Sequence, residues 1–297
     1  MYPRAFHYHR AASLPDAVAM LGQLGDDSKL LAGGQSLIPL MKLRFATPRH
    51  LVDLNFVPET SFVKEEGGRL RFGALTRHAE IENSPLVAKI PILCDCAAGI
   101  ADVQVRNRGT IGGSIAEADP SGDWATVLMT LSTEIVCFGP NGERSVPLQD
   151  FIQDAYTTVL AHDELVSEVR VGIPSQGSGG AYLAFKRSAP VYPTASVAVQ
   201  LVMAGDVCQQ AAISLGCVGL TAIRATEAEK ALKGNTVSAK TIASAMEAAQ
   251  AAADPQPDMR GSAEYKRTLI SALVQRAIEV ALRRARGEQV EVSHIYA

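Results

Sequence analysis

The chain has 297 residues, of which 47% are hydrophobic and 20% charged, and this composition is typical of a soluble globular protein with enough core for two domains. Its net charge of −3 provides no basic field, so we expect no nucleic-acid partner. No apolar run reaches the length that spans a bilayer, and the N-terminus lacks the apolar core of a secretory signal. We therefore expect no membrane span and a cytoplasmic location.

The cysteines and histidines form no metal-binding pattern. The five cysteines are an odd number spread along the chain, which fits reduced thiols in a reducing compartment. No further cysteine lies at a zinc or iron–sulfur spacing from Cys94 and Cys96, and the six histidines, His294 included, form no HExxH arrangement. We expect no metal ligand in this chain.

The N-terminal segment predicts a helix and two strands around a glycine turn. Residues 13–25 form an amphipathic pattern that begins with Ser13 as a cap and has Pro15 in its first turn. A short strand at 28–32 runs into the turn Gly-Gly-Gln-Ser-Leu at 33–37, and an apolar segment and a strand at 50–54 follow. The turn is a candidate phosphate cradle, although it matches neither a P-loop nor a GxGxxG fingerprint.

The middle of the chain predicts alternating strands and short helices. We expect Thr76 to cap a helix through residue 83, with Glu80 near the capping-box position, and a buried helix at 91–100. A helix at 123–131 follows a glycine-rich loop. The strands are expected at residues 70–73, 133–138 and 164–173, with a turn at 139–142.

The loop at residues 107–124 concentrates glycine, hydroxyl and acid in little apolar bulk. Three of its glycines, Gly109, Gly112 and Gly113, allow sharp turns and a close approach of the backbone to a bound group. Thr110 and Ser114 add small donors suited to a phosphate, while Asp119 and Asp123 would suit ribityl or ribose hydroxyls. Taken alone, the loop could equally be a glycine-rich surface segment.

The run Pro-Ser-Gln-Gly-Ser-Gly-Gly at 174–180 predicts a linker. Beyond it, strands at 181–186, 194–203 and 207–218 precede helices at 225–233, 238–253 and 262–286. The predicted fold class is therefore α+β. We expect a domain at 1–176, divided into subdomains at about 1–55 and 56–176, and a C-terminal α+β domain at 177–297 with a three-stranded sheet and helices.

Two glycine turns in one domain indicate a ligand with two phosphates or an extended polar tail, and FAD fits that description. The segments 32–37 and 110–123 also resemble the paired FAD motifs of the medium subunit of molybdenum hydroxylases, the carbon monoxide dehydrogenase and xanthine dehydrogenase family. The resemblance extends to 6–10, 181–186 and 261–267 and covers nearly the whole chain. It implies an N-terminal two-subdomain FAD-binding fold, PCMH/vanillyl-alcohol-oxidase-like, followed by a small antiparallel sheet with helices.

The resemblance also implies partners. In this family a large subunit oxidises substrate at a molybdenum cofactor, a small subunit carries two [2Fe–2S] clusters, and the flavin subunit passes electrons to an external acceptor, commonly in a dimer of heterotrimers. No catalytic residue is then expected in this chain. The residues that the resemblance implies for FAD binding are Lys29, Leu30, Leu31, Ala32, Gly33, Gly34, Gln35, Ser36, Leu37, Ile100, Thr110, Gly113, Ser114, Ala118, Asp119, Asp123, Leu165, Lys186 and Tyr192.

Three residues depart from the commonest family pattern. Gln35 replaces the usual histidine, Ser114 replaces asparagine, and Glu117 stands where histidine or asparagine is frequent. All three are polar, so FAD binding is still expected, and the redox tuning of the flavin is the property that these changes could alter. The departures favour an N-heteroaromatic or related small organic substrate over carbon monoxide.

Alternative functions differ in what the chain does alone. A medium subunit of an aerobic carbon monoxide dehydrogenase would share the fold. A stand-alone FAD-dependent oxidase or dehydrogenase would turn over substrate without partners, although the length leaves little room for a substrate cap. A nucleotide-binding interaction module would bind FAD or ADP without being reduced by an iron–sulfur partner.

Overall fold

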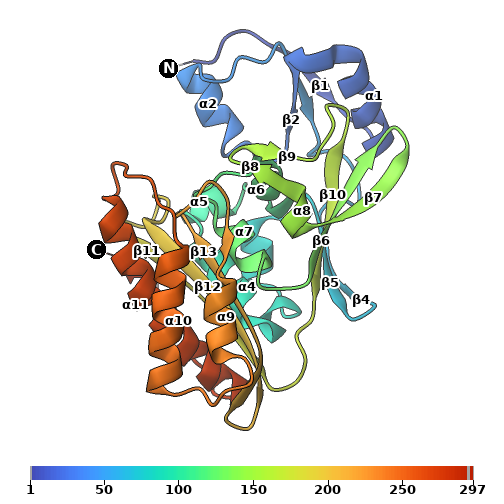
Figure 1. Ribbon diagram of the computed structural model, residues 1–297. Coiled ribbons are helices and arrows are strands. Elements are labelled where there is room, and N and C mark those ends of the chain that lie inside the picture. The colour runs from blue at the N-terminus through green and yellow to red at the C-terminus, as the bar shows by residue number, and fades with distance from the viewer. Residues whose placement is uncertain (1, 293–294, 297) are drawn as a thin grey trace.

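The N-terminal subdomain is a small parallel sheet with two helices (Figure 1). The computed structural model describes residues 2–292 and 295–296, so His294 lies outside the described residues. The sheet has the order β1-β3-β2. Its strands and helices are β1 (His7–Arg10), α1 (Leu14–Leu24), the 3₁₀ turn η1 (Gly25–Asp27), β2 (Ser28–Leu31), α2 (Leu37–Leu43) and β3 (His50–Asp53).

The ends of α1 confirm the signals in the sequence. The Ser13 side chain accepts a hydrogen bond from the Asp16 backbone N–H, which satisfies one of the free donors of the first turn. Gly25 ends the helix at φ +63°, a conformation that glycine adopts without strain. Its buried face packs on the sheet through Ala17, Val18 and Leu21.

The second subdomain has a five-stranded antiparallel sheet in the order β4-β5-β10-β6-β7. The strands are β4 (Val63–Glu66), β5 (Arg69–Gly73), β6 (Thr133–Gly139), β7 (Gly142–Pro147) and β10 (Leu165–Gly172), with a separate pair β8 (Ile152–Asp154) and β9 (Thr157–Thr158). The helices are α3 (His78–Glu82), η2 (Val87–Lys89), α4 (Pro91–Gly99), α5 (Val103–Arg106), α6 (Ile111–Glu117), α7 (Asp123–Leu128) and α8 (Leu148–Phe151).

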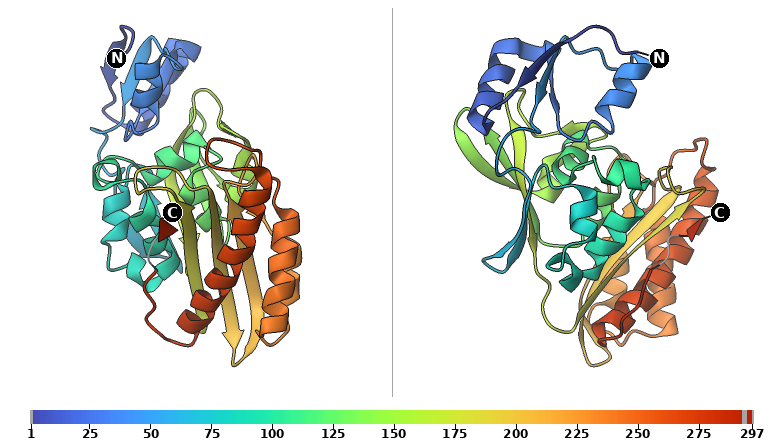
Figure 2. Two further views of the ribbon diagram at one scale, coloured as in Figure 1. Left: turned by 90° about the vertical axis from the view of Figure 1, so that its left-hand side faces the viewer. Right: turned by 180° about the vertical axis from the view of Figure 1, so that it is seen from behind.

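The C-terminal sheet lies between two layers of helices (Figure 2). Its order is β14-β13-β12-β11-β15, from β11 (Ser178–Lys186), β12 (Ala195–Ala204), β13 (Val207–Gly216), β14 (Ile223–Arg224) and β15 (Ile295–Tyr296). The helices α9 (Thr226–Leu232), α10 (Ala239–Ala252) and α11 (Ala263–Ala285) cover one face, and α4 and α7 contact the other. The sequence predicted three strands here; β14 and β15 are two-residue edge strands, too short for an alternating pattern to reveal.

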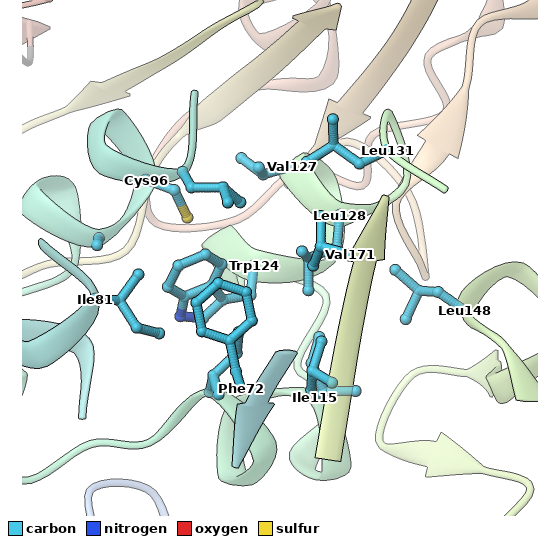
Figure 3. Packing of buried hydrophobic residues seen from close by; sticks show 14 of the residues in the cluster. Phe72, Ile81, Cys96, Ile115, Trp124, Val127, Leu128, Leu131, Leu148 and Val171 are labelled. Atoms are coloured by element: carbon cyan, nitrogen blue, oxygen red, sulfur yellow. The ribbon is translucent and has the colours of Figure 1, made fainter. Parts of the chain in front are cut away.

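The core beneath the middle helices is centred on Trp124, which is fully buried (Figure 3). Trp124 follows the first residue of α7, and Phe72 of β5 and Ile81 of α3 belong to the same cluster. Tyr182 of β11 also belongs to it, so the cluster joins the antiparallel sheet to the C-terminal sheet. This packing fixes the first turn of α7, where Asp123 lies.

Three local predictions were wrong. Arg77, not Thr76, is the N-cap of α3, because the Thr76 hydroxyl bonds to the backbone of Phe62 instead; Glu80 does accept a hydrogen bond from the backbone N–H of Arg77. The loop predicted at 107–124 contains α6. The segment predicted as a linker already enters β11 at Ser178.

Close packing explains the glycines at the start of β11. A Cβ at Gly179 would lie 2.1 Å from the carbonyl oxygen of Ala281 in α11. This glycine therefore permits a close approach of helix and sheet rather than providing a flexible linker. Among the described residues, no helix is both long and apolar enough to cross a bilayer.

Candidate functional site

A cleft of about 290 Å³ lies where the two glycine turns, the middle helices and the C-terminal sheet meet. Most residues predicted to bind FAD line it. They are Leu30, Ala32, Gly33, Gly34, Gln35, Ser36, Leu37, Ile100, Thr110, Gly113, Ser114, Asp119, Asp123, Lys186 and Tyr192.

Four predicted residues do not line the cleft. Leu165 is 1% exposed and packs with the core beneath α1, so β10 turns it away from the cleft. Ala118 ends α6 in the left-handed conformation, and its carbonyl accepts a hydrogen bond from the backbone N–H of Tyr156. Lys29 and Leu31 lie on β2 on either side of Leu30, which does reach the cleft.

The two glycine turns contact each other directly. A Cβ at Gly33 would lie 2.3 Å from the carbonyl oxygen of Arg108 and 2.8 Å from the Cα of Gly109. No side chain larger than hydrogen fits there without displacing backbone. The turns therefore form one continuous wall although they belong to different subdomains.

Two polar side chains also connect the turns. The Asn55 amide donates to the carbonyl oxygen of Ala32 at 2.8 Å, and its own oxygen accepts a hydrogen bond from the Arg77 guanidinium. Arg77 in turn donates to the carbonyl oxygen of Arg108. This chain of hydrogen bonds holds the first turn against the second behind the cleft wall.

The second turn leads into α6. The Thr110 hydroxyl accepts a hydrogen bond from the Gly113 N–H at 3.1 Å and caps the helix. A Cβ at Gly113 would lie 2.7 Å from that hydroxyl, so glycine keeps the backbone open at the cleft surface.

The polar floor of the cleft is Asp123 with its two partners. The Tyr182 hydroxyl donates to Asp123 Oδ1 at 2.7 Å, and Lys186 Nζ lies 3.7 Å from the same oxygen. Lys186 is 1% exposed and donates to the carbonyl oxygen of Gly99 at 2.5 Å. A buried cation and carboxylate are thus held at fixed positions by one strand, β11, and two helices, α4 and α7.

The rim carries two groups whose ionisation is shifted. Burial and the neighbouring Asp119 raise the pKa of the Glu117 carboxyl, and the positive charge of Lys29 opposes this rise in part. Burial and Asp119 likewise raise the pKa of Tyr192, so this phenol stays protonated. Arg260 from the C-terminal domain lies 5.6 Å from the centre of the Tyr192 ring.

The sequence analysis missed several lining residues. His78, Ala101, Val105, Gly109, Glu117, Gly122, Pro190 and Val191 also line the cleft. Gly109 and Gly122 stand inside the glycine-rich stretch that had drawn attention, and Glu117 had been noted only as a departure from the family. His78 is a lone histidine without a motif, and no signal in the sequence could have selected it.

The cleft has the features that a dinucleotide requires. The paired glycine turns leave the backbone bare where an added Cβ would collide, as at Gly33 and Gly113. Carboxylates at Asp119 and Asp123 can accept from sugar hydroxyls, and Ile100 and Val191 provide apolar surface for rings. These residues fit FAD.

Comparison with known proteins decides the family. A family model described as "FAD binding domain in molybdopterin dehydrogenase" matches residues 4–175, and one described as "CO dehydrogenase flavoprotein C-terminal domain" matches residues 180–281. The chain belongs to the FAD-binding medium subunits of molybdenum hydroxylases. The α+β fold and the FAD cofactor that the sequence predicted are therefore confirmed.

Relatives of this medium subunit match over nearly their whole length. The carbon monoxide dehydrogenase medium chain of Hydrogenophaga pseudoflava is 42% identical over 95% of this chain and 98% of that protein. The 6-hydroxypseudooxynicotine dehydrogenase complex subunit alpha of Paenarthrobacter nicotinovorans is 39% identical over 99% of this chain and 100% of that protein. The solved carbon monoxide dehydrogenase of Hydrogenophaga pseudoflava superimposes with a TM-score of 0.93 at 43% identity, covering 96% of this chain and 99% of that chain.

The three departures from the family pattern all lie at the cleft of this medium subunit. Gln35 bonds to the carbonyl oxygen of Gly33 at 3.2 Å and so closes the first turn on itself. Ser114 and Glu117 lie on α6 and face the same space. Within the described residues, no group of three or more His, Cys, Asp or Glu side chains is arranged to hold a metal ion.

Proposed function

We propose that this medium subunit holds FAD in the cleft between its two glycine turns and relays electrons from the [2Fe–2S] clusters of a small partner subunit to an external acceptor. The observation that supports this most is the direct contact of the two turns, because it joins the predicted FAD motifs in one wall. Bound FAD would supply the chemistry, accepting electrons and releasing them to the acceptor.

The residues of the chain bind and orient the cofactor in this proposal. The glycines of the two turns would let the backbone approach the phosphates closely, and Asp119 and Asp123 would accept hydrogen bonds from hydroxyl groups. Lys186 is fixed by Gly99 and Asp123 and so presents its charge in one place. Tyr192, protonated and 43% exposed, would cover the open side and limit access of water.

The partners and location are proposed on the same basis. A large subunit with a molybdenum cofactor and a small subunit with two [2Fe–2S] clusters would complete the enzyme, as a dimer of heterotrimers. All five cysteines, which lie within the described part of the chain, are free thiols, and this supports a cytoplasmic location. We also propose domains at 1–176, with subdomains at about 1–55 and 56–176, and at 177–297; the three separate main sheets support this division.

We propose an N-heteroaromatic or related small organic compound as the substrate of the large subunit. The departures at Gln35, Ser114 and Glu117, together with a relative whose name includes 6-hydroxypseudooxynicotine, a pyridine derivative, support this choice. Carbon monoxide is the second candidate, because the medium chain of a carbon monoxide dehydrogenase is 42% identical. Bleaching of the flavin in the purified complex under carbon monoxide, compared with pyridine and quinoline compounds, separates the two.

The purified chain tests the role of the subunit. We expect it to show a flavin absorption spectrum, with no molybdenum or iron by elemental analysis, and to be reduced by its reduced iron–sulfur partner. A chain that takes up no FAD would reject the proposal. Turnover of substrate by the lone chain would favour a stand-alone oxidase, and FAD binding without reduction by the partner would favour a nucleotide-binding module.

A further inference from the structure

His78 lies at the cleft and is held by the core residue Trp124. The Trp124 indole donates from Nε1 to His78 Nδ1 at 3.1 Å, and the two rings are 6.0 Å apart between centroids. The backbone N–H of His78 also donates to the carbonyl oxygen of Gly109 at 3.1 Å. Ring and backbone of His78 are thus both fixed, the first by α7 and the second by the glycine-rich turn.

The contact with Trp124 determines where the imidazole carries its proton. An indole nitrogen can only donate, so Nδ1 must be the acceptor and the proton of the neutral ring must be on Nε2. Burial, aided by the positive charges of Arg77 and Arg106, lowers the pKa of His78 to about 3. The ring is therefore neutral at physiological pH, with one N–H group on its Nε2 side.

That Nε2–H faces Gly109 and the cleft without a partner. A Cβ at Gly109 would lie 2.7 Å from Nε2, so this edge of the ring lies directly against the glycine, and both residues line the cleft. His78 is only 5% exposed. Among the described residues no group makes a hydrogen bond to Nε2, and this nitrogen is not among the fully buried atoms that lack a partner, so it is open to the cleft and free to donate to a ligand.

We propose that His78 is a cofactor-binding residue, and that its Nε2–H donates a hydrogen bond to an oxygen of the bound dinucleotide beside Gly109. The inference rests on the proposed binding of FAD in the cleft. Glycine at position 109 gives the acceptor room to approach, since any side chain there would meet the imidazole. Trp124 is a positioning residue, because it keeps the proton on the nitrogen that faces the ligand.

Two amide substitutions separate the two ring nitrogens. In His78→Asn the side-chain oxygen can take the place of Nδ1 and still accept from Trp124, but no donor reaches the position of Nε2. In His78→Gln the amide nitrogen can take the place of Nε2, while the acceptor for Trp124 is lost. The pair therefore tests the donor to the ligand separately from the contact with the core.

The measurement is FAD binding to the full chain freed of flavin, followed by fluorescence titration. We expect His78→Asn to bind FAD about tenfold more weakly than the wild type. We expect His78→Gln to stay within about threefold of the wild type in FAD affinity but to melt at a lower temperature without flavin, because Trp124 loses its acceptor. A titration with ADP shows whether the acceptor belongs to that half of the cofactor.

The outcomes distinguish this inference from the proposed function. If the wild-type chain binds no FAD, the proposed function fails. If the wild type binds FAD and His78→Asn binds it equally well, the proposed function stands and the role of His78 is overturned. A result in which only His78→Gln weakens FAD binding also overturns it, because the Trp124 contact alone would then matter.

Discussion

Gly33 and Gly109 touch through their backbones, so closely that a Cβ on Gly33 would lie 2.8 Å from the Cα of Gly109. Each belongs to a different subdomain, and the cleft that both residues line lies at their junction. Closure of the cleft and docking of the N-terminal subdomain therefore depend on the same contact. A change at Gly33 should affect both.

Gly33→Ala is expected to weaken FAD binding by at least about tenfold, because its Cβ would collide with backbone atoms of Arg108 and Gly109 and separate the turns. The measurement is FAD titration of the full chain. Gly22→Ala is the matched control: it lies in α1 with no atom within 4 Å of an added Cβ, and alanine in a helix should stabilise the fold by about 0.5–1 kcal/mol.

Equal FAD affinity of Gly33→Ala and Gly22→Ala would show that the turns can separate without loss of the site. Thermal melting of both variants without flavin gives the effect on the fold alone. A melting temperature of Gly33→Ala close to that of the wild type, with weaker FAD binding, is the pattern expected for a contact that shapes the cleft.

The sequence predicted the regular elements well where apolar periodicity was strong, and failed where tertiary packing decided the outcome. The helix α6 was predicted as loop because Gly112 and Gly113 lower helix propensity. In the fold, a Cβ at Gly112 would lie 2.5 Å from the Cβ of Ala74, so glycine is what lets α6 pack against the end of β5. Thr110 then supplies the cap that the glycines do not.

The sequence allowed prediction of those residues of the candidate site that stand in recognisable motifs. The glycine turns, Lys186 and Tyr192 could be identified because they stand in segments that resemble the family. Leu165, which the resemblance placed among the FAD-binding residues, packs in the core beneath α1, because position within a strand does not tell which neighbouring layer a side chain contacts. The bridge from Asn55 through Arg77 to the second turn joins residues that carry no motif, and only the fold brings them together.

Lys186→Met is expected to destabilise the chain by about 3 kcal/mol, because the Asp123 carboxylate would remain buried without its cation. Adding Asp123→Asn should recover at least about 1 kcal/mol of that loss, since the amide carries no charge. Unfolding by denaturant provides both values. Lys230→Met is the control, because Lys230 and Glu227 form an exposed pair worth less than about 1 kcal/mol. If the free-energy changes of the single variants Lys186→Met and Asp123→Asn simply add in the double variant, the two side chains are not coupled.

Arg284→Met is expected to cost about 3–5 kcal/mol of stability. Arg284 donates to both carboxylate oxygens of Asp95, at 2.6 and 2.9 Å, and both side chains are 7% exposed. The pair connects α11 with α4 across the C-terminal sheet, so its loss should loosen the contact between the domains. Denaturant unfolding measures the cost.

The adjacent Arg283 provides the control for that substitution. Arg283 pairs with Glu288 at the surface, where its side chain is 53% exposed, so Arg283→Met should change stability by less than about 1 kcal/mol. Similar losses in the two variants would mean that the helix terminus, rather than the buried pair, is responsible.

Glu168 should make the stability of the fold depend on acid pH. Burial alone raises the pKa of its carboxyl, but hydrogen bonds from Arg71 and Arg170 outweigh burial and hold the pKa below its ordinary value. A carboxylate with a lowered pKa stabilises the folded state fully above its unfolded pKa of about 4.3, and this contribution is lost as the pH falls through the folded pKa. Protonation of Glu168 thus removes its ion pair with Arg71, which links the neighbouring strands β10 and β5.

Glu168→Gln tests this dependence, because glutamine keeps the shape and cannot titrate. We expect the variant to be less stable than the wild type near neutral pH, and the difference to narrow between about pH 5 and about pH 3 as the wild-type carboxyl takes up its proton. Urea unfolding across this range gives both curves. Glu65→Gln, which breaks an exposed pair with Lys89, should give a curve nearly parallel to that of the wild type. A constant gap between wild type and Glu168→Gln would show that the carboxylate contributes through packing, because a contribution through charge must vanish once the group is protonated.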